Sequence, residues 1–251
     1  YSEAFLALGD KAHITDRYNA ACSWALANKI DSSFIQLFYI SQKGNYKNYG
    51  HISTDTDLSI LYSDQRWKQI LDLVKINKEK AEAKLNKTLV AILDTIYQED
   101  QGLRRQISEI EKKYGRDSDE IKVHWETIAE KDSINLIKIQ KILDENGWLG
   151  SDIVGEQGNM TLFLVIQHSD LSIQEKYLPI MREAVRKGNA NASNLALLED
   201  RVALRQGKKQ IYGSQISRDE NGEYYVSPLV DPENVNQRRK EVGLHLTIEE
   251  Y

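Results

Sequence analysis

The sequence predicts a mainly α-helical protein, in which an N-terminal helical hairpin is joined by a long helix to a helical domain with one small β-hairpin. Three observations lead to this fold class. Only three prolines interrupt 251 residues. Apolar residues recur at spacings of three and four through most of the chain, as on one face of a helix. Strand-like segments occur only near the C-terminus, on either side of Asn221-Gly222.

The first element is a helical hairpin over Asp16 to Lys43. Small and aromatic residues line its first helix, and Asn28 to Asp31 form the turn. From Lys78 to Asp100 a heptad-like set of apolar residues predicts one long amphipathic helix that links the two parts. This set comprises Ala81, Leu85, Leu89, Ile92, Leu93 and Ile96.

A charged helical hairpin follows, and three more helices precede the strands. Gly115 closes one helix of the hairpin, and the spacing of Asp117 and Glu120 predicts a capping box for the next, which ends at Gly147. The later helices are expected at about Gln157 to His168, Ser172 to Arg186 and Asn191 to Gln206. Ser172 and Glu175 predict a second capping box, with a tight turn before it.

Two strands are expected at Gln210 to Ile216 and Glu223 to Val226, because Asn-Gly provides the positive φ angles of a hairpin turn. Gly213 lies inside the first strand. Asp231-Pro232-Glu233 then provides a cap, a first-turn proline and an acid for one more helix.

Composition argues against several classes of partner. The net charge of −5 and pI near 5.7 provide no broad positive field for nucleic acid. No apolar run approaches the roughly 18 residues of a membrane span. The single cysteine, Cys22, excludes an intrachain disulfide and a thiolate cluster, and its small, apolar neighbours predict an inert buried thiol. The compartment stays open, an exported one included, because a signal peptide would precede Tyr1.

The N-terminal segment resembles a terminal tetratricopeptide repeat with its capping helix. The resemblance covers about residues 1–77 and rests on Tyr18 to Ala27, Asp31 to Gly44, Asp55 to Leu58 and Asp64 to Trp67. Asn28 stands where the repeat has a turn glycine, and Ser33 where it has alanine. The resemblance implies a protein-interaction or packing role; an ordinary helical hairpin that caps the next domain is the alternative.

Several motifs of the second half resemble, in the same order, a bacterial domain family of unknown function, DUF6624. The resemblance runs from about Leu89 to Tyr251 and implies candidate site residues but no activity. Its motifs are Asp100-Gln101 with Arg104, Gly147 to Gly150 with Val154-Gly155, Gln167 to Asp170, Asp200 to Val202, Tyr212 to Gln215 and Val235 to Arg239. Ser169 and Ser214 stand where the family pattern has alanine and threonine.

His168 is the leading candidate for acid–base chemistry, because imidazole titrates near neutral pH and this residue follows the apolar run Leu162 to Ile166. A structural alternative is that it satisfies the last carbonyls of its helix. Gln167 and Asp170 flank it as candidate ligand contacts. His168 and Asp170 do not share a helix face and no third ligand has suitable spacing, so no metal or other cofactor is expected.

The remaining candidate ligand contacts come from three segments. Asp200 and Arg201 lie in an apolar helix, where an ion pair within the protein is the alternative role. Tyr212, Ser214 and Gln215 surround Gly213, and a glycine in a strand often marks the close approach of a ligand or another backbone. Arg104 and Arg238, with Arg105 and Arg239 beside them, offer guanidinium groups to a small anion.

Two functions agree with these patterns. The first and preferred is a non-catalytic protein that binds or orients a protein or peptide partner through the repeat-like segment. Its second domain would hold a small ligand, an anion among the candidates, or a peptide through Gln167, His168 and the Tyr212 to Gln215 strand. The second is a hydrolase or transferase for a polar small molecule, with His168 as general base and Arg104 or Arg238 holding an anionic group.

Overall fold

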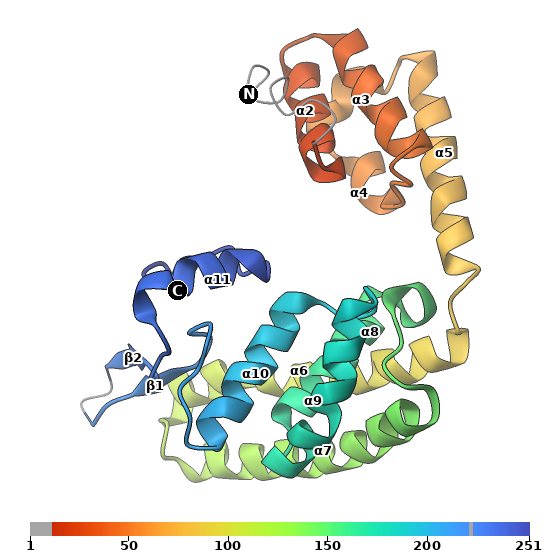
Figure 1. Cartoon of the computed structure of the whole chain (residues 1–251). Helices are drawn as coiled ribbons and strands as arrows, with labels where there is room; N and C mark the ends of the chain where they lie inside the picture. The colour runs from red at the N-terminus through yellow and green to blue at the C-terminus, as the bar shows by residue number, and fades with distance from the viewer. Residues whose placement is uncertain (1–11, 221–222) are drawn as a thin grey trace. The chain divides into compact units, whose positions relative to one another are not determined.

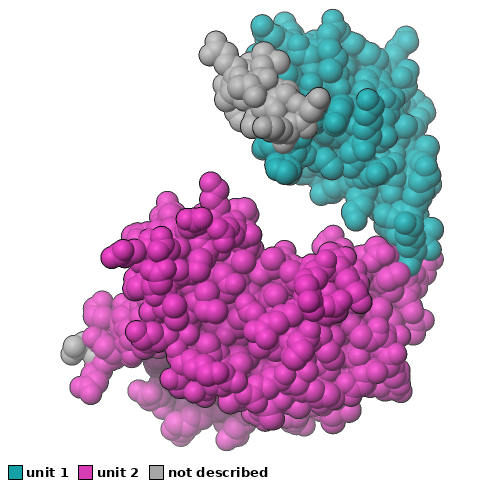
Figure 2. Space-filling view, viewed as in Figure 1, with its two compact units in different colours: residues 1–84 teal, residues 85–251 magenta. Residues whose placement is uncertain are grey.

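The structure is a computed structural model that describes residues 12–220 and 223–251 (Figure 1). The chain forms two compact units, residues 1–84 and 85–251, which Figure 2 colours separately. Each unit has its own hydrophobic core. The predicted fold class is confirmed: the described elements are mostly helices, with one small two-stranded sheet. None of the helices in the described residues is long and apolar enough to cross a membrane.

The first unit begins with the predicted helical hairpin. Helices α2 (Ile14–Leu26) and α3 (Ile30–Gln42) pack against each other, and Asn28 makes the turn in the left-handed region at φ 57°. The short helix α4 (Tyr49–Thr54), the 3-10 helix η2 (Thr56–Leu61) and α5 (Gln65–Glu82) complete the unit. Its core includes Tyr18, Ala21, Phe34, Leu37, Ile40, Ile52, Leu58, Trp67 and Ile70.

The single long helix predicted over Lys78 to Asp100 is wrong. Helix α5 ends at Glu82, and a separate helix, α6 (Lys87–Tyr114), begins after Asn86. The side chain of Asn86 accepts a hydrogen bond from the backbone N–H of Leu89 at 3.1 Å and so caps the new helix. Its own N–H donates to the Ile153 carbonyl at 2.8 Å. The apolar spacing continues from α5 into α6 although the backbone breaks between them. The spacing of apolar residues alone therefore did not reveal the break.

The second unit is a bundle of long helices. Helix α6 packs against both α7 (Asp119–Asn146) and α8 (Ser151–His168), while α9 (Leu171–Arg186) packs against α10 (Ala192–Arg205). The apolar run at the end of α8 lies in the core, with Leu162 and Ile166 fully buried. This burial is what brings the following Gln167 and His168 to the edge of the core.

The helix starts differ from the predicted ones. Ser118, not Asp117, caps α7, through a hydrogen bond from the Ile121 N–H. Helix α9 begins at Leu171 with Asp170 as its N-cap, so the predicted Ser172–Glu175 capping box is wrong by two residues. Helix α8 begins before Gln157, at Ser151, and Gly155 at φ 74° kinks it. Several neighbouring residues could serve as the N-cap of each helix, and tertiary packing decides which of them does.

The β-hairpin forms with a shorter first strand than predicted. Strand β1 (Ile216–Arg218) pairs antiparallel with β2 (Tyr224–Val226), and Ser217 lies opposite Tyr225. Residues 210–215 form no strand, because several of their N–H groups donate to the Asp200 carboxylate. The Asn221-Gly222 turn lies outside the described residues. The 3-10 helix η3 (Pro232–Asn234) and α11 (Val235–Glu241) follow, where the sequence predicts a helix.

Candidate functional site

The centre of the candidate site is a hydrogen bond between His168 and a buried acid. Nδ1 of His168, at the end of α8, lies 2.9 Å from Oδ1 of Asp100 on α6. The Asp100 side chain is 2% exposed and that of His168 is 19% exposed. In the described residues Nε2 of His168 has no hydrogen-bond partner within the protein. A carboxylate on Nδ1 fixes the orientation of the ring and leaves Nε2 free to act.

Arg104 ties this acid to the next helix. Its guanidinium donates to Asp100 Oδ1 at 3.0 Å and to both oxygens of Asp132 on α7, at 3.0 and 2.6 Å. Asp100 also accepts from Gln101 Nε2 at 2.6 Å. Because two carboxylates already occupy Arg104, its charge is largely neutralised within the protein.

Asp100 stays ionised in this network. Burial alone would raise the pKa of its carboxyl group, but the hydrogen bond and charge of His168, the charge of Arg104 and the hydrogen bond from Gln101 lower it. The net direction is downward from the ordinary value. Asp100 is therefore the fixed negative charge on which the imidazole of His168 depends.

Arg201, on α10, connects the His168 segment to the loop before β1. Its NH1 donates to the Gln167 carbonyl at 2.8 Å, and its Nε donates to Gln215 Oε1 at 3.1 Å. Neighbouring Arg205 donates to the Ser169 carbonyl at 2.7 Å. Two guanidinium groups thus hold the carbonyls on either side of His168.

The electrostatics of Arg201 are unusual for an arginine. It is partly buried, and no ion pair joins it to a carboxylate in the described part of the chain. Burial lowers the pKa of its guanidinium, and the positive charges of Arg205 and Arg104 lower it further. Arg201 is therefore a desolvated cation that is bonded only to neutral oxygens, is repelled by like charges and has no negative charge to compensate it in the described residues.

Asp200 binds the backbone of the loop that precedes β1. Its fully buried carboxylate accepts the backbone N–H groups of Ile211, Tyr212 and Ser214, at distances from 2.6 to 3.2 Å. The loop bends around it through Gly213, at φ +67°. This left-handed backbone favours glycine, and an added Cβ would also lie 2.5 Å from Ile248 Cδ1, which would have to move. Asp200 therefore shapes the loop that presents Gln215 to Arg201.

The other predicted ligand contacts each bind separate groups of the protein. Tyr212 Oη reaches Glu199 at 3.5 Å, and Ser214 Oγ accepts from Gln215 Nε2 at 3.1 Å. Arg238 donates to the carbonyls of Ile211, Val230 and Asp231, and pairs with the Asp231 carboxylate.

The two arginines beside predicted contacts differ in burial. Arg239 is 2% exposed and holds the Tyr212 and Leu246 carbonyls, whereas Arg105 is exposed. None of these groups is joined to His168 by a direct hydrogen bond.

A pocket of about 220 Å³ opens beside His168. Asp170 and Ser169 line it together with Asp132 and Ser133 of α7. The hydroxyl of Ser169 donates to the Ile166 carbonyl, and that of Ser133 to the Ala129 carbonyl, so neither is paired with the imidazole. The pocket offers a base and carboxylates but no activated hydroxyl in the described residues.

Sequence reasoning left several members of this network out of the candidate site. Asp100 belongs to a motif of the DUF6624 resemblance, but the sequence predicted no site role for it. Asp132 and Arg205 belong to none of those motifs. Asp132 is 28 residues from Arg104, and nothing in its neighbourhood predicts the pairing. Gln167, in contrast, was a candidate: its side chain is 5% exposed and its backbone carbonyl also accepts from Gln174.

The bundle and its hydrogen-bonded network define a helical domain with one buried acid–histidine pair and an adjoining arginine. Residues 84–251 match the model of a family of unknown function, DUF6624, and the chain belongs to that family. The tetratricopeptide-like character of the first unit is not confirmed and stays a prediction.

No curated protein and no solved structure matches the chain at a significant level. The site is therefore interpreted from its own chemistry.

Proposed function

We propose that the DUF6624 domain of this protein is a non-catalytic binding domain for a small anionic ligand, which it holds beside His168 and Arg201. The observation that carries this proposal is the partly buried guanidinium of Arg201, whose hydrogen bonds go to neutral oxygens of Gln167 and Gln215. An anion there would neutralise a charge that the protein leaves uncompensated.

The surroundings favour an anion in two further ways. Arg205 adds a second positive charge at the same backbone segment, through its hydrogen bond to the Ser169 carbonyl. In the imidazolium form of His168, Nδ1 donates to Asp100 and Nε2 carries a second proton that it can donate to an anion. A carboxylate or phosphate monoester has the geometry that a guanidinium binds with paired hydrogen bonds.

Binding of inorganic phosphate and citrate to Arg201→Gln and wild type, measured by calorimetry and thermal shift, tests this function. We expect saturable binding to wild type and a loss of at least about tenfold in affinity in the variant. Arg186→Gln is the matched control, since Arg186 is an exposed arginine at the end of α9. Equal affinities in both variants, or no saturable binding of either anion to wild type, would refute the proposal.

We also propose that the N-terminal hairpin contacts a protein or peptide partner. The support is its tetratricopeptide-like sequence and two large apolar side chains that stay exposed on it, Leu26 at 67% and Ile35 at 64%. Replacing both by aspartate should abolish co-purification of a partner that the wild-type chain retains.

The second candidate function is hydrolysis or group transfer, with His168 as general base. The observation that favours it is the 2.9 Å bond from His168 to buried Asp100, an arrangement that prepares an imidazole for proton transfer. Arg104 and Arg238 hold protein oxygens, so in this reading Arg201 would orient the anionic group. Turnover distinguishes the two functions: an enzyme converts its substrate as wild type and loses turnover but not substrate binding in His168→Asn, whereas a binding protein shows saturable binding without turnover in either form.

A further inference from the structure

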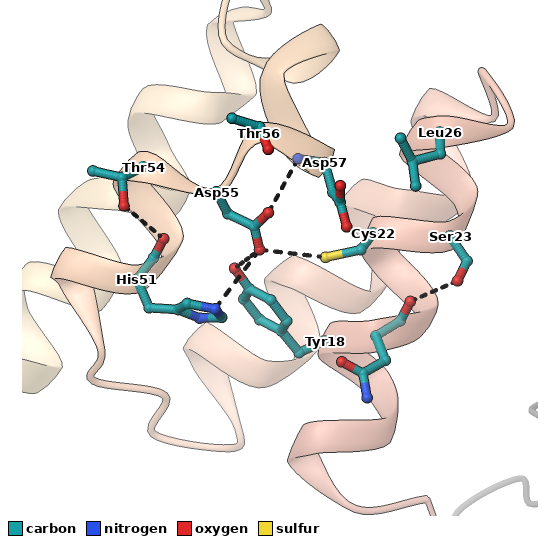
Figure 3. A pocket seen from close by; sticks show the side chains of 10 residues that line it. Tyr18, Cys22, Ser23, Leu26, His51, Thr54, Asp55, Thr56 and Asp57 are labelled. Carbon is teal, nitrogen blue, oxygen red and sulfur yellow. Dashed lines mark hydrogen bonds and ion pairs between the residues drawn. The ribbon is translucent and has the colours of Figure 1, made fainter. Parts of the chain in front are cut away.

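A second polar cluster lies in the first unit and shares no residue with the His168 network. Figure 3 shows Tyr18 and Cys22 of α2, His51 of α4 and Asp55 and Asp57 at the start of η2 around one pocket. The pocket has a volume of about 590 Å³. Cys22 Sγ and one carboxylate oxygen each of Asp55 and Asp57 lie within 4.8 Å of one another.

Asp55 is the centre of this cluster. Its Oδ2 accepts from Tyr18 Oη at 2.7 Å and lies 3.7 Å from Cys22 Sγ and 3.8 Å from His51 Nε2. Its Oδ1 accepts from the Asp57 N–H at 3.0 Å, which caps η2. Helical backbone on both sides holds these groups in place, so the donors converge without a long loop.

His51 directs its Nε2 atom, which can bind a metal ion, toward Asp55. Its Nδ1 lies 2.9 Å from Tyr46 Oη, and its ring is tilted against that of Tyr18, with centroids 4.8 Å apart. In the tautomer that donates from Nδ1 to Tyr46, the lone pair of Nε2 faces Asp55. Hydrogen bonds of this kind commonly fix the orientation of a metal-binding histidine.

The charge of the pocket favours a cation. Two carboxylates and a thiol face it, and among the described residues no lysine or arginine lines it. Within residues 12–220 and 223–251, the ion pair of Asp55 is with His51 and with no lysine or arginine. This concentration of negative potential differs from the His168 network, where Arg104 already pairs with both Asp100 and Asp132.

We infer that the first unit binds a divalent transition-metal ion, with Zn²⁺ as the best fit, through Cys22, Asp55 and Asp57, and with His51 as the nearest further donor. A sulfur, a nitrogen and two carboxylate oxygens form a mixed donor set that suits four-coordinate zinc. Calcium and magnesium prefer oxygen ligands alone, so the thiol and imidazole argue against them.

Binding would exchange one proton for the metal. The thiol hydrogen now lies between Cys22 Sγ and Asp55 Oδ2, and the ion takes that position as the proton leaves to solvent. Tyr18 keeps its hydrogen bond to the same carboxylate and supports the ligand from behind. The metal would link α2, which ends at Leu26, to the α4–η2 segment, which begins 23 residues later at Tyr49.

Co²⁺ titration of the full chain, followed by absorption spectroscopy, tests this site. The chain has one cysteine, so a thiolate-to-cobalt charge-transfer band can arise from Cys22 alone. We expect such a band to saturate at one equivalent, to be displaced by Zn²⁺ and to be absent in Cys22→Ser. The nearly isosteric serine should leave the fold intact.

Two further variants keep the inference testable if the serine variant misfolds. Asp57→Asn changes an exposed ligand and should weaken Co²⁺ binding by at least about tenfold. Asp72→Asn, an exposed acid on α5 that pairs with Lys68, is the matched control and should bind as wild type does. No charge-transfer band in wild type, a band that persists in Cys22→Ser, or equal affinities of the two aspartate variants would overturn the inference.

Discussion

The two units each place an acidic side chain in a partly enclosed polar cluster, but they balance its charge differently. In the family domain, Asp100 is bonded to His168 and Arg104, and Arg104 is bonded in turn to Asp132. In the first unit, Asp55 accepts from Tyr18 and lies beside Cys22 and a second acid, Asp57. One cluster contains its own cations, whereas the other has an excess of negative charge.

This difference separates two kinds of polar site. A carboxylate that is paired with cations orders its neighbours, and here it orients an imidazole toward a pocket. A carboxylate that is surrounded by neutral donors and other acids is stabilised when a cation arrives from solvent. The same residue type therefore predicts opposite ligands: an anion beside Arg201 and a metal ion beside Asp55.

The largest expected effect is on stability in the family domain. Asp100→Asn removes the negative charge that faces His168 and Arg104, and leaves two partly buried donors without their charged acceptor. We expect the free energy of unfolding to fall by about 3 kcal/mol, at the low end for broken buried pairs because Asp132 still pairs with Arg104. Chemical denaturation of the two proteins at neutral pH measures it, and a change below about 1 kcal/mol would contradict the assigned role.

The pH dependence of unfolding sharpens the same comparison. The pKa of Asp100 is lowered in the folded protein, so its contribution to stability is fully present above the ordinary carboxyl pKa of about 4. That contribution is lost as the pH falls from about 4 through the folded-state pKa. Thermal melts should therefore converge for wild type and Asp100→Asn as the solution becomes more acidic. Curves that stay parallel through this range would show that the carboxylate charge of Asp100 is not the source of the difference.

The smallest effect is expected at the corresponding acid of the first unit. Asp55→Asn keeps an acceptor for the Asp57 N–H and relieves repulsion between two acids, so we expect a loss of only about 1 kcal/mol without added metal. With saturating Zn²⁺ the difference should grow, since wild type alone would gain the binding energy. Denaturation with and without the metal measures this change. A loss as large as that of Asp100→Asn, in the absence of metal, would remove the contrast between the clusters.

The fold was largely predictable because its signals are local. Apolar spacing identified the α2–α3 hairpin and the helices of the family domain, and Gly147 marked the end of α7. The exact helix starts were less predictable, since Ser118 and Asp170 compete with neighbours that are equally good caps. The break at Asn86 and the loop at residues 210–215 depend on contacts with Ile153 and Asp200, which no local pattern contains.

The candidate site was predictable only in part. The motif containing Gln167 and His168 identified the segment, and Arg201 was a candidate contact. The partners that give these residues their chemistry lie far away in sequence: Asp100 is 68 residues from His168, and Gln167 is 34 residues from Arg201. In the first unit, Cys22 was interpreted as an inert thiol because the acids beside it come from a segment 33 residues later.

The sequence by itself determined the helical class of this protein, the membership of its second unit in the DUF6624 family and the segment that contains His168. These properties follow from the spacing of apolar residues and the order of motifs, which are local features of the sequence. Only the tertiary structure decided which acids meet which cations. Charge balance depends on distances between side chains from different helices, and packing sets those distances.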